Sequence, residues 1–456
     1  MISRPLMVGA ALVLCATAAS AMDLLQVWQA VQQNDPQGAV SEASRAAGAT
    51  RHDQAMALWR PYLGMSASAG WGSAQSQMSA AQFAMPGAAP VGGASFATSV
   101  NGGSTTRWTL AAKQPLYSPE RRAQSAQLDT MALASELAWR LAQQDWMLQT
   151  TQRYLDVVQA ERRLALVQQQ QLAVDKALTE AKDRFVLGDA PVTDTHEAQA
   201  RAQALAAQAI VASNDLDMVR QVLVDVTGLP VQALQLHAPH GQTLTPAIGP
   251  LTDWLQRAGQ NSPVLKLQQA QTDAAQQEIE KHRATASATL DLVAQATRER
   301  ISGTGDFGAA SNTQSQQMVG LLLNVPLSTG GWRTAKLQEA IHGLDKARAE
   351  LAQTRLQVSQ MTRAAWQAVH SGQARLAALD AARTASRARL ASTQLGRQVG
   401  DRTTLDLLNA QNDADAAELA WLQGQIDTLI AHLRLHALAG QLDESQLQAV
   451  NAVLVN

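Results

Sequence analysis

Apolar and polar side chains alternate along two pairs of segments in this chain. The apolar positions of the first pair are Leu63, Met65, Ala67, Ala69 and Trp71, then Trp108, Leu110 and Ala112. Those of the second pair are Leu290, Leu292, Ala294 and Ala296, then Val319, Leu321, Leu323 and Val325. A period of two is typical of β-strands, so the pattern predicts one β-hairpin at about 62–117 and another at about 289–327.

The middle of each predicted hairpin is rich in glycine, serine and other small or polar residues. We expect a flexible loop from Gly72 to Thr106 in the first hairpin and from Arg298 to Gln316 in the second. The run Gly303-Thr304-Gly305 falls in the second of these segments. It is therefore interpreted as loop and not as a nucleotide-binding motif.

Proline is missing from two long segments that follow the hairpins. No proline lies between Pro119 and Pro191, and none follows Leu327. Apolar residues in these segments recur at helical or heptad spacing: Leu141, Leu148 and Leu155, and Leu419, Leu422, Ile426, Leu429 and Leu433. This spacing predicts long helices that pack on neighbours, although a soluble coiled-coil bundle would show the same stripes.

The sequence also repeats itself. The phrase Leu24–Pro36 returns as Leu251–Pro263, and Gly188-Asp189 is matched by Gly400-Asp401. We therefore expect a first structural repeat at 22–240, a second at 241–442 and a C-terminal tail at 443–456. The first copy is longer by about 15 residues, which we assign to the loop of its hairpin, because surface loops tolerate insertion best.

The first 21 residues have the pattern of a secretory signal peptide. Arg4 precedes an apolar run from Leu6 to Ala18, and Ala19-Ser20-Ala21 has the small-x-small form of a cleavage site. We expect cleavage there and a mature chain that begins at Met22. The apolar run is too short for a membrane anchor, and Leu14 before Cys15 argues against a lipid-modified cysteine.

Composition excludes several classes of function. The formal net charge of −2 offers no field for nucleic acid, and aromatic residues make up only 4% of the chain. Cys15 is the one cysteine, and the nine histidines form no HExxH or other metal-ligand motif. We expect a protein without catalytic activity, metal or cofactor, and without a nucleic-acid partner.

Strands offer the only route across a membrane, because no later segment has the roughly 18 consecutive apolar residues of a transmembrane helix. Two hairpins give four strands, which cannot close a barrel by themselves, whereas three copies would supply twelve. Aromatic residues flank the strands as an interfacial girdle against lipid would: Trp59, Tyr62, Trp71, Trp108, Tyr117 and Trp332. Packing in a core is the alternative for each.

Two glycines mark sharp turns between long helices. Gly188 and Gly400 are suited to the left-handed conformation that ends a helix. Thr193 or Thr404 would satisfy the free N–H groups of the following helix, and Asp194 and Asp406 would lie in its first turn, where the helix dipole favours an acid. A capping role is thus an alternative to any functional role for both aspartates.

The repeat resembles that of the TolC-type outer-membrane channels of Gram-negative bacteria. The resemblance is strongest in Arg184–Gly188 with Val192-Thr193-Asp194, and in Val399–Gln411. It implies a mainly α fold with a membrane β-barrel: internally duplicated long helical hairpins plus two β-hairpins, in a homotrimeric channel with a long periplasmic tunnel. Such channels open on docking to a periplasmic adaptor and an inner-membrane ABC or RND transporter, in type I secretion, drug efflux or both.

By this resemblance Asp406 would ring the constriction at the periplasmic tip, where three copies favour cations. The chain departs from the best-known members in two places. Asn409 stands where they carry a second aspartate, and Arg397 stands where they carry a tyrosine of the closing latch. We therefore predict a weaker cation site.

The resemblance also assigns a second latch. Arg402 would contact Thr193 and Asp194 on the neighbouring hairpin and so keep the tip closed. Two other classes stay open at this point: a periplasmic adaptor and a structural coiled-coil protein. Neither gives a reason for a pair of strands in each repeat.

Overall fold

The structure is a computed structural model of the chain, and it describes residues 22–83, 86–87, 89–189, 191–231, 236, 248–305 and 308–455. The predicted signal peptide 1–21, with its cleavage residues Ala19 and Ala21, lies outside the described residues. The predicted boundary between the repeats, at residues 240 and 241, also lies outside the described residues.

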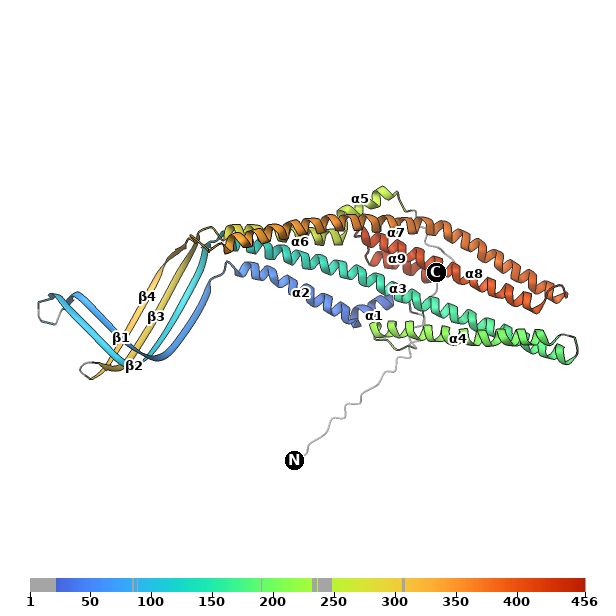
Figure 1. Ribbon diagram of the computed structural model, residues 1–456, viewed down its shortest axis with the longest axis horizontal. Coiled ribbons are helices and arrows are strands. Elements are labelled where there is room, and N and C mark those ends of the chain that lie inside the picture. Colours follow the sequence, from blue (N-terminus) through green and yellow to red (C-terminus); the bar gives the residue numbers. More distant parts are fainter. Residues whose placement is uncertain are drawn as a thin grey trace, which may run out of the picture. The chain divides into compact units, whose positions relative to one another are not determined.

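One order of elements occurs twice along the chain: two helices, two strands, a long helix and a shorter helix (Figure 1). The first series is α1 Leu24–Asn34, α2 Pro36–Ala57, β1 Tyr62–Phe83, β2 Val91–Tyr117, α3 Pro119–Val186 and α4 Val192–Thr227. The second is α5 Leu251–Asn261, α6 Pro263–Ala284, β3 Thr289–Gly305, β4 Gly308–Asn324, α7 Trp332–Gln398 and α8 Thr404–Leu438, and α9 Glu444–Val455 follows. The predicted hairpins and long helices are present.

Two compact units divide these elements, and each unit draws on both series. Of the described residues, the first unit contains those up to Ala46, those within Glu136–Gln268 and those from Leu351 on. The second contains Ala47–Ser135 and Gln269–Glu350, and so holds all four strands. None of the helices in the described ranges is long and apolar enough to cross a membrane.

A proline separates the first two helices of each series. Pro36 and Pro263 are the first residues of α2 and α6, where the missing N–H costs no helical hydrogen bond. Asp35 before Pro36 is extended and its carboxylate accepts a hydrogen bond from the Gln37 N–H at 2.9 Å. The phrase that repeats in the sequence is therefore a short helix followed by the start of the next one.

The second unit is built around one antiparallel sheet with the strand order β1-β2-β3-β4. The expected long loops are wrong, because strand pairing continues through most of these segments: Gly72 pairs with Gly103, and Arg298 pairs with Ser315. Gly303-Thr304-Gly305 is likewise the end of β3. Small and polar residues can form these strands because the ladder uses only backbone N–H and C=O groups.

The two faces of the sheet differ in character, since side chains alternate along a strand and paired residues share a face. The apolar face presents Leu63, Met65, Ala67, Ala69 and Trp71 of β1; Trp108, Leu110 and Ala112 of β2; Leu292, Ala294 and Ala296 of β3; and Val319, Leu321 and Leu323 of β4. Met65 is 73% exposed and Val319 is 76% exposed. The opposite, mostly polar face carries Ser66, Thr109, Thr297 and Gln316 in one row.

The predicted aromatic girdle is largely exposed in the structure. The side chains of Tyr62, Trp71, Trp108, Tyr117 and Trp332 are between 41% and 82% exposed. Core packing is therefore excluded for these five within the single chain.

The main core of the first unit lies among α1, α3, α4, α8 and α9. Trp28 and Trp146 meet edge to face with ring centroids 5.0 Å apart. Four residues of the predicted stripe of α8 belong to this core: Leu422, Ile426, Leu429 and the fully buried Leu433. The segment predicted only as a tail forms α9, whose Leu447, Val450 and Leu454 are buried at helical spacing.

Candidate functional site

The turns between the long helices share one hydrogen-bond pattern. Gly188 follows α3 with φ of 80°, and the Asp189 N–H donates to the Arg184 carbonyl at 2.8 Å. Gly400 follows α7 with φ of 87°, and the Asp401 N–H donates to the Gly396 carbonyl at 2.8 Å. A bond that spans five residues around a left-handed glycine is the Schellman ending of a helix. The predicted role of both glycines is confirmed.

The helices that leave these turns begin differently from each other. The residue that caps α8 is Thr403: its Oγ1 accepts from the Asp406 N–H at 3.1 Å, and its N–H donates to the Asp406 carboxylate at 3.0 Å. The expectation that Thr404 caps this helix is wrong by one residue, because the helix begins at Thr404 and the cap precedes it.

At the first turn the capping prediction for Thr193 is also wrong. The helix α4 begins at Val192, so the capping position falls on Pro191, which has no side-chain acceptor. The Asp194 N–H instead donates to the Pro191 carbonyl at 3.2 Å. The carboxylate of Asp194 lies in the first turn, as expected, and both Thr193 and Asp194 are exposed.

A small pocket gathers several of the predicted gate residues at the second turn. It has a volume of about 220 Å³ and is lined by Arg389, Ser392 and Thr393 of α7, by Arg402 of the turn, and by Asp406 and Asn409 of α8. We call it the Asp406 pocket. The hydrogen bond from the Thr403 backbone N–H lowers the pKa of Asp406 most, followed by the Thr403 hydroxyl and the charges of Arg402 and Arg389. Asp406 is therefore an anion at neutral pH.

Arg389 belongs to this site although no sequence pattern singled it out. Its guanidinium forms an ion pair with Asp413 at 2.7 Å, and so ties α7 to α8 one turn beyond Asn409. Gly396 was missed as well: a Cβ atom there would lie 2.8 Å from Cγ of Arg402. Both residues could be found only once the pairing of the two helices was known.

Arg397 joins the two long hairpins. Its guanidinium forms a hydrogen-bonded ion pair with Glu180 of α3, near the end of that helix. Glu180 was not identified from the sequence. Arg397 stands where the resemblance implies a tyrosine of the latch. In this chain the position therefore takes part in an ion pair instead.

The predicted contacts of Arg402 with Thr193 and Asp194 are not made inside one chain. Among the described residues, no hydrogen bond or ion pair joins Arg402 to either of them. Arg402 is exposed and lies over Gly396 instead. A contact with the hairpin of another copy stays a prediction.

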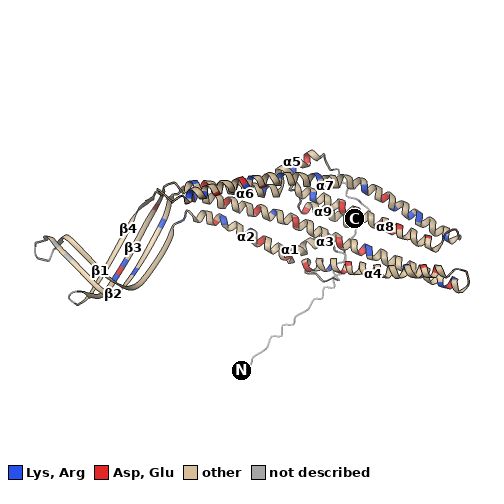
Figure 2. Ribbon diagram, viewed as in Figure 1, with Lys and Arg blue, Asp and Glu red and all other residues tan. Residues whose placement is uncertain are grey.

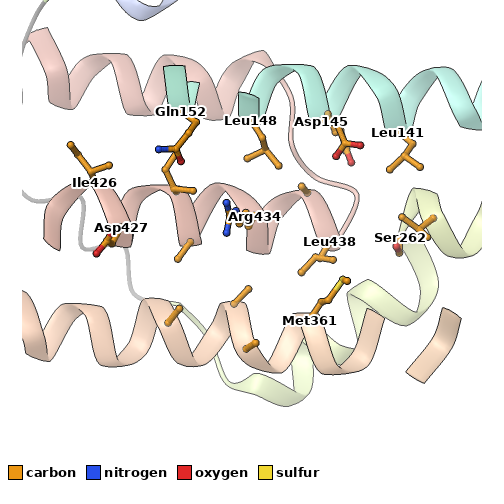
Figure 3. Close-up of a pocket in the computed structure, with 18 residues that line it drawn as sticks. Leu141, Asp145, Leu148, Gln152, Ser262, Met361, Ile426, Asp427, Arg434 and Leu438 are labelled. Carbon is orange, nitrogen blue, oxygen red and sulfur yellow. The ribbon is translucent and has the colours of Figure 1, made fainter. Parts of the chain in front are cut away.

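A larger cavity of about 810 Å³ lies in the first unit between α3, α7 and α8 (Figure 3). Leucine, alanine and isoleucine side chains make up most of its wall, together with Met361. Three charged residues, Asp145, Asp427 and Arg434, also line it, and burial raises the pKa of the Asp145 carboxyl. Within the described ranges, no group of three or more His, Cys, Asp or Glu side chains could hold a metal ion.

Known outer-membrane proteins are similar to this chain in sequence and in fold. The family model of the outer membrane efflux proteins matches residues 254–441, a range that begins inside α5 and ends just after α8. The outer membrane protein TolC of Escherichia coli is 24% identical over 99% of this chain and 88% of its own. The alkaline protease secretion protein AprF of Pseudomonas aeruginosa is 28% identical over 76% of this chain and 72% of its own. The chain thus resembles the TolC-type outer-membrane channels over nearly its whole length.

Solved structures of the same fold agree. The outer membrane protein VceC of Vibrio cholerae superposes with a TM-score of 0.72 at 18% identity, and the alignment covers 91% of this chain and 96% of VceC. The CmeC outer membrane channel of Campylobacter jejuni gives a TM-score of 0.72 at 14% identity over 95% and 89% of the two chains. The matches with the efflux-protein model and with the secretion and efflux channels indicate that the chain resides in the outer membrane and serves export. The adaptor alternative finds no support, and the relatives are channel and transport proteins.

Proposed function

We propose that three copies of this chain form a passive exit duct, in which a twelve-stranded barrel lies in the outer membrane. The observation that carries the proposal is the four-stranded sheet, whose edge strands β1 and β4 each have only one partner in the described chain. An apolar face as exposed as this one needs lipid beside it, and lipid allows no open sheet edge. Closure with further copies satisfies both requirements, and three copies give a strand number usual for such barrels.

The helical hairpins α3–α4 and α7–α8 would form the periplasmic tunnel, and their turns would form its gate. Asp406 from each copy would ring the opening. Arg402 with Thr193 and Asp194 of a neighbouring hairpin, and Arg397 with Glu180, would hold the gate closed. A periplasmic adaptor and an inner-membrane ABC or RND transporter would open it and drive transport, since the duct itself carries out no catalysis.

Protein secretion is the cargo class that the relatives favour. AprF is described as an alkaline protease secretion protein, and PrtF of Dickeya chrysanthemi, 27% identical over 75% of this chain, as a proteases secretion protein. We propose that this chain likewise serves a type I secretion system for an extracellular protein. Comparison of culture supernatants of the wild type and a deletion strain tests this: loss of one or few large proteins is expected, and an unchanged supernatant with lost drug resistance would indicate efflux instead.

Conductance tests the duct itself. Purified protein added to a planar lipid bilayer should produce discrete current steps of uniform size. If protein extracted from the outer membrane binds the bilayer and yet produces no current steps, the proposal is contradicted.

A further inference from the structure

Two arginines stand on the apolar face of the sheet. Arg298 and Arg300 follow Ala294 and Ala296 on the same face of β3, and both are exposed. Among the residues that the structure describes, neither makes a hydrogen bond or an ion pair. Glu299 between them points to the opposite face, where it pairs with Arg107 at 2.7 Å. The sheet thus leaves two positive charges uncompensated on its apolar side.

No carboxylate of the strands can neutralise them. The described strands contain two acidic residues, Asp291 and Glu299. Both belong to the mostly polar face, and both are already paired, Asp291 with Lys113 at 2.9 Å and Glu299 with Arg107. A second copy of the sheet set edge to edge would offer the same paired groups. The counter-charge must therefore come from outside the sheet.

The position of the arginines indicates what that counter-charge is. Going along the strands away from the helices, the apolar residues come first and the arginines lie beyond them. Arg298 pairs in register with Trp108 on one side and Ser315 on the other, and Arg300 pairs with Thr106 and Thr313. The face thus changes there from apolar side chains to a tryptophan, two cations and hydroxyl groups, and Figure 2 shows how few other charged residues the strands carry. This sequence of groups matches the passage from acyl chains to phosphates at a membrane surface.

We propose that Arg298 and Arg300 bind the phosphate of a membrane lipid whose acyl chains lie along the apolar face of β2 and β3. Guanidinium groups bind phosphate with two parallel hydrogen bonds, and residues two apart on a strand lie about 6.6 Å from each other, so both can reach one headgroup. The inference rests on the proposed function, because it requires the sheet to be embedded in lipid.

Titration of the detergent-solubilised protein with dioleoyl phosphatidic acid, followed by native mass spectrometry, tests the proposal. Dioleoyl phosphatidylcholine serves as the comparison lipid, because the positive charge of its choline group offsets the negative charge of its phosphate. The wild type should retain phosphatidic acid in preference, and millimolar inorganic phosphate should not displace it, since the acyl chains contribute to binding. The R298Q/R300Q variant should lose roughly fivefold in affinity for each arginine removed. R298K/R300K should keep most of the affinity, and R107Q, with the same substitution on the opposite face, should bind as the wild type does.

Equal retention of phosphatidic acid by R298Q/R300Q and the wild type, when both insert into bilayers, would overturn this inference and leave the duct intact. Displacement by inorganic phosphate would show an ion site without lipid and would also overturn it. If the wild type itself neither inserts nor retains any lipid, the proposed function fails.

Discussion

Thr403 and Asp406 hold each other in a reciprocal pair of hydrogen bonds at the start of α8. The same carboxylate lies in the Asp406 pocket beside Arg389 and Arg402. Asp406 therefore has two separable properties: it closes a capping box, and it carries a negative charge at the proposed constriction.

Replacing each partner separates these properties. Thr403→Ala removes the cap and should lower the free energy of unfolding by about 1 kcal/mol, with cation selectivity unchanged. Asp406→Asn retains an oxygen acceptor for the Thr403 N–H and removes the charge, so cation selectivity should fall. Chemical denaturation and reversal potentials in planar bilayers measure the two effects. Selectivity that persists in Asp406→Asn would remove Asp406 from the constriction.

The ion pair of Arg397 and Glu180 should bias the gate toward its closed state. A partly exposed pair of this kind contributes up to about 1 kcal/mol, so Arg397→Ala or Glu180→Ala should raise the open probability by about two- to fivefold. The exchanged pair R397E/E180R keeps the attraction and should restore the wild-type value. Single-channel recording is the measurement, and an exchange variant as open as the single variants would show that the pairing itself plays no part.

Gly38 provides a test of the core. A Cβ atom at this position would lie 2.3 Å from the ring of Trp146, whose Nε1 donates to Asp35 at 2.8 Å. Gly38→Ala should therefore cost about 1–3 kcal/mol through overpacking. Gly259→Ala in α5 is the matched control, because nothing lies near its Cβ, and it should be neutral or stabilising by up to about 1 kcal/mol. The melting temperature of Gly38→Ala should fall, whereas that of Gly259→Ala should stay the same or rise.

The histidine pair of α8 predicts a dependence of stability on pH. The rings of His432 and His436 lie 4.6 Å apart, and burial, with some repulsion from His436, lowers the pKa of His432 to about 4. Between about pH 6.5 and 4, His432 therefore binds a proton in the unfolded chain but not in the folded chain. Stability should be full above this range and fall as the pH drops through it.

The variant His432→Gln removes this contribution, so its melting temperature should fall less between pH 7.5 and 5 than that of the wild type. Burial lowers the pKa of His436 too; the charge of Arg257 lowers it further, and Asp443 opposes both effects. His370→Gln, on an exposed ring that stacks on Trp366, serves as the control, and its melting temperature should change with pH as that of the wild type does. Parallel curves for His432→Gln and the wild type would contradict the assignment.

The helices and turns of this chain could be predicted where one residue type decides the local structure. The missing prolines predicted the long helices, and Gly188 and Gly400 predicted the turns. The full length of the strands could not be predicted, because serine, glycine and alanine are held in β1 and β2 by pairing with distant backbone groups. The pair of Arg397 with Glu180 was hidden for the same reason, since their helices are adjacent only in the fold. Thr403 was missed by one position because the exact start of α8 decides which threonine caps it.

Closure of the barrel by three chains is the central claim, and cysteine cross-linking between β1 of one copy and β4 of the next tests it most directly. In a C15A background, S66C would be combined in turn with Q314C, Q316C and M318C on the mostly polar face, since a disulfide forms only when the Cα atoms come within about 7 Å. At least one combination should give a covalent band of three chains and nothing larger, absent from each single-cysteine variant. Monomers in all combinations, or ladders beyond three chains, would contradict the trimeric barrel.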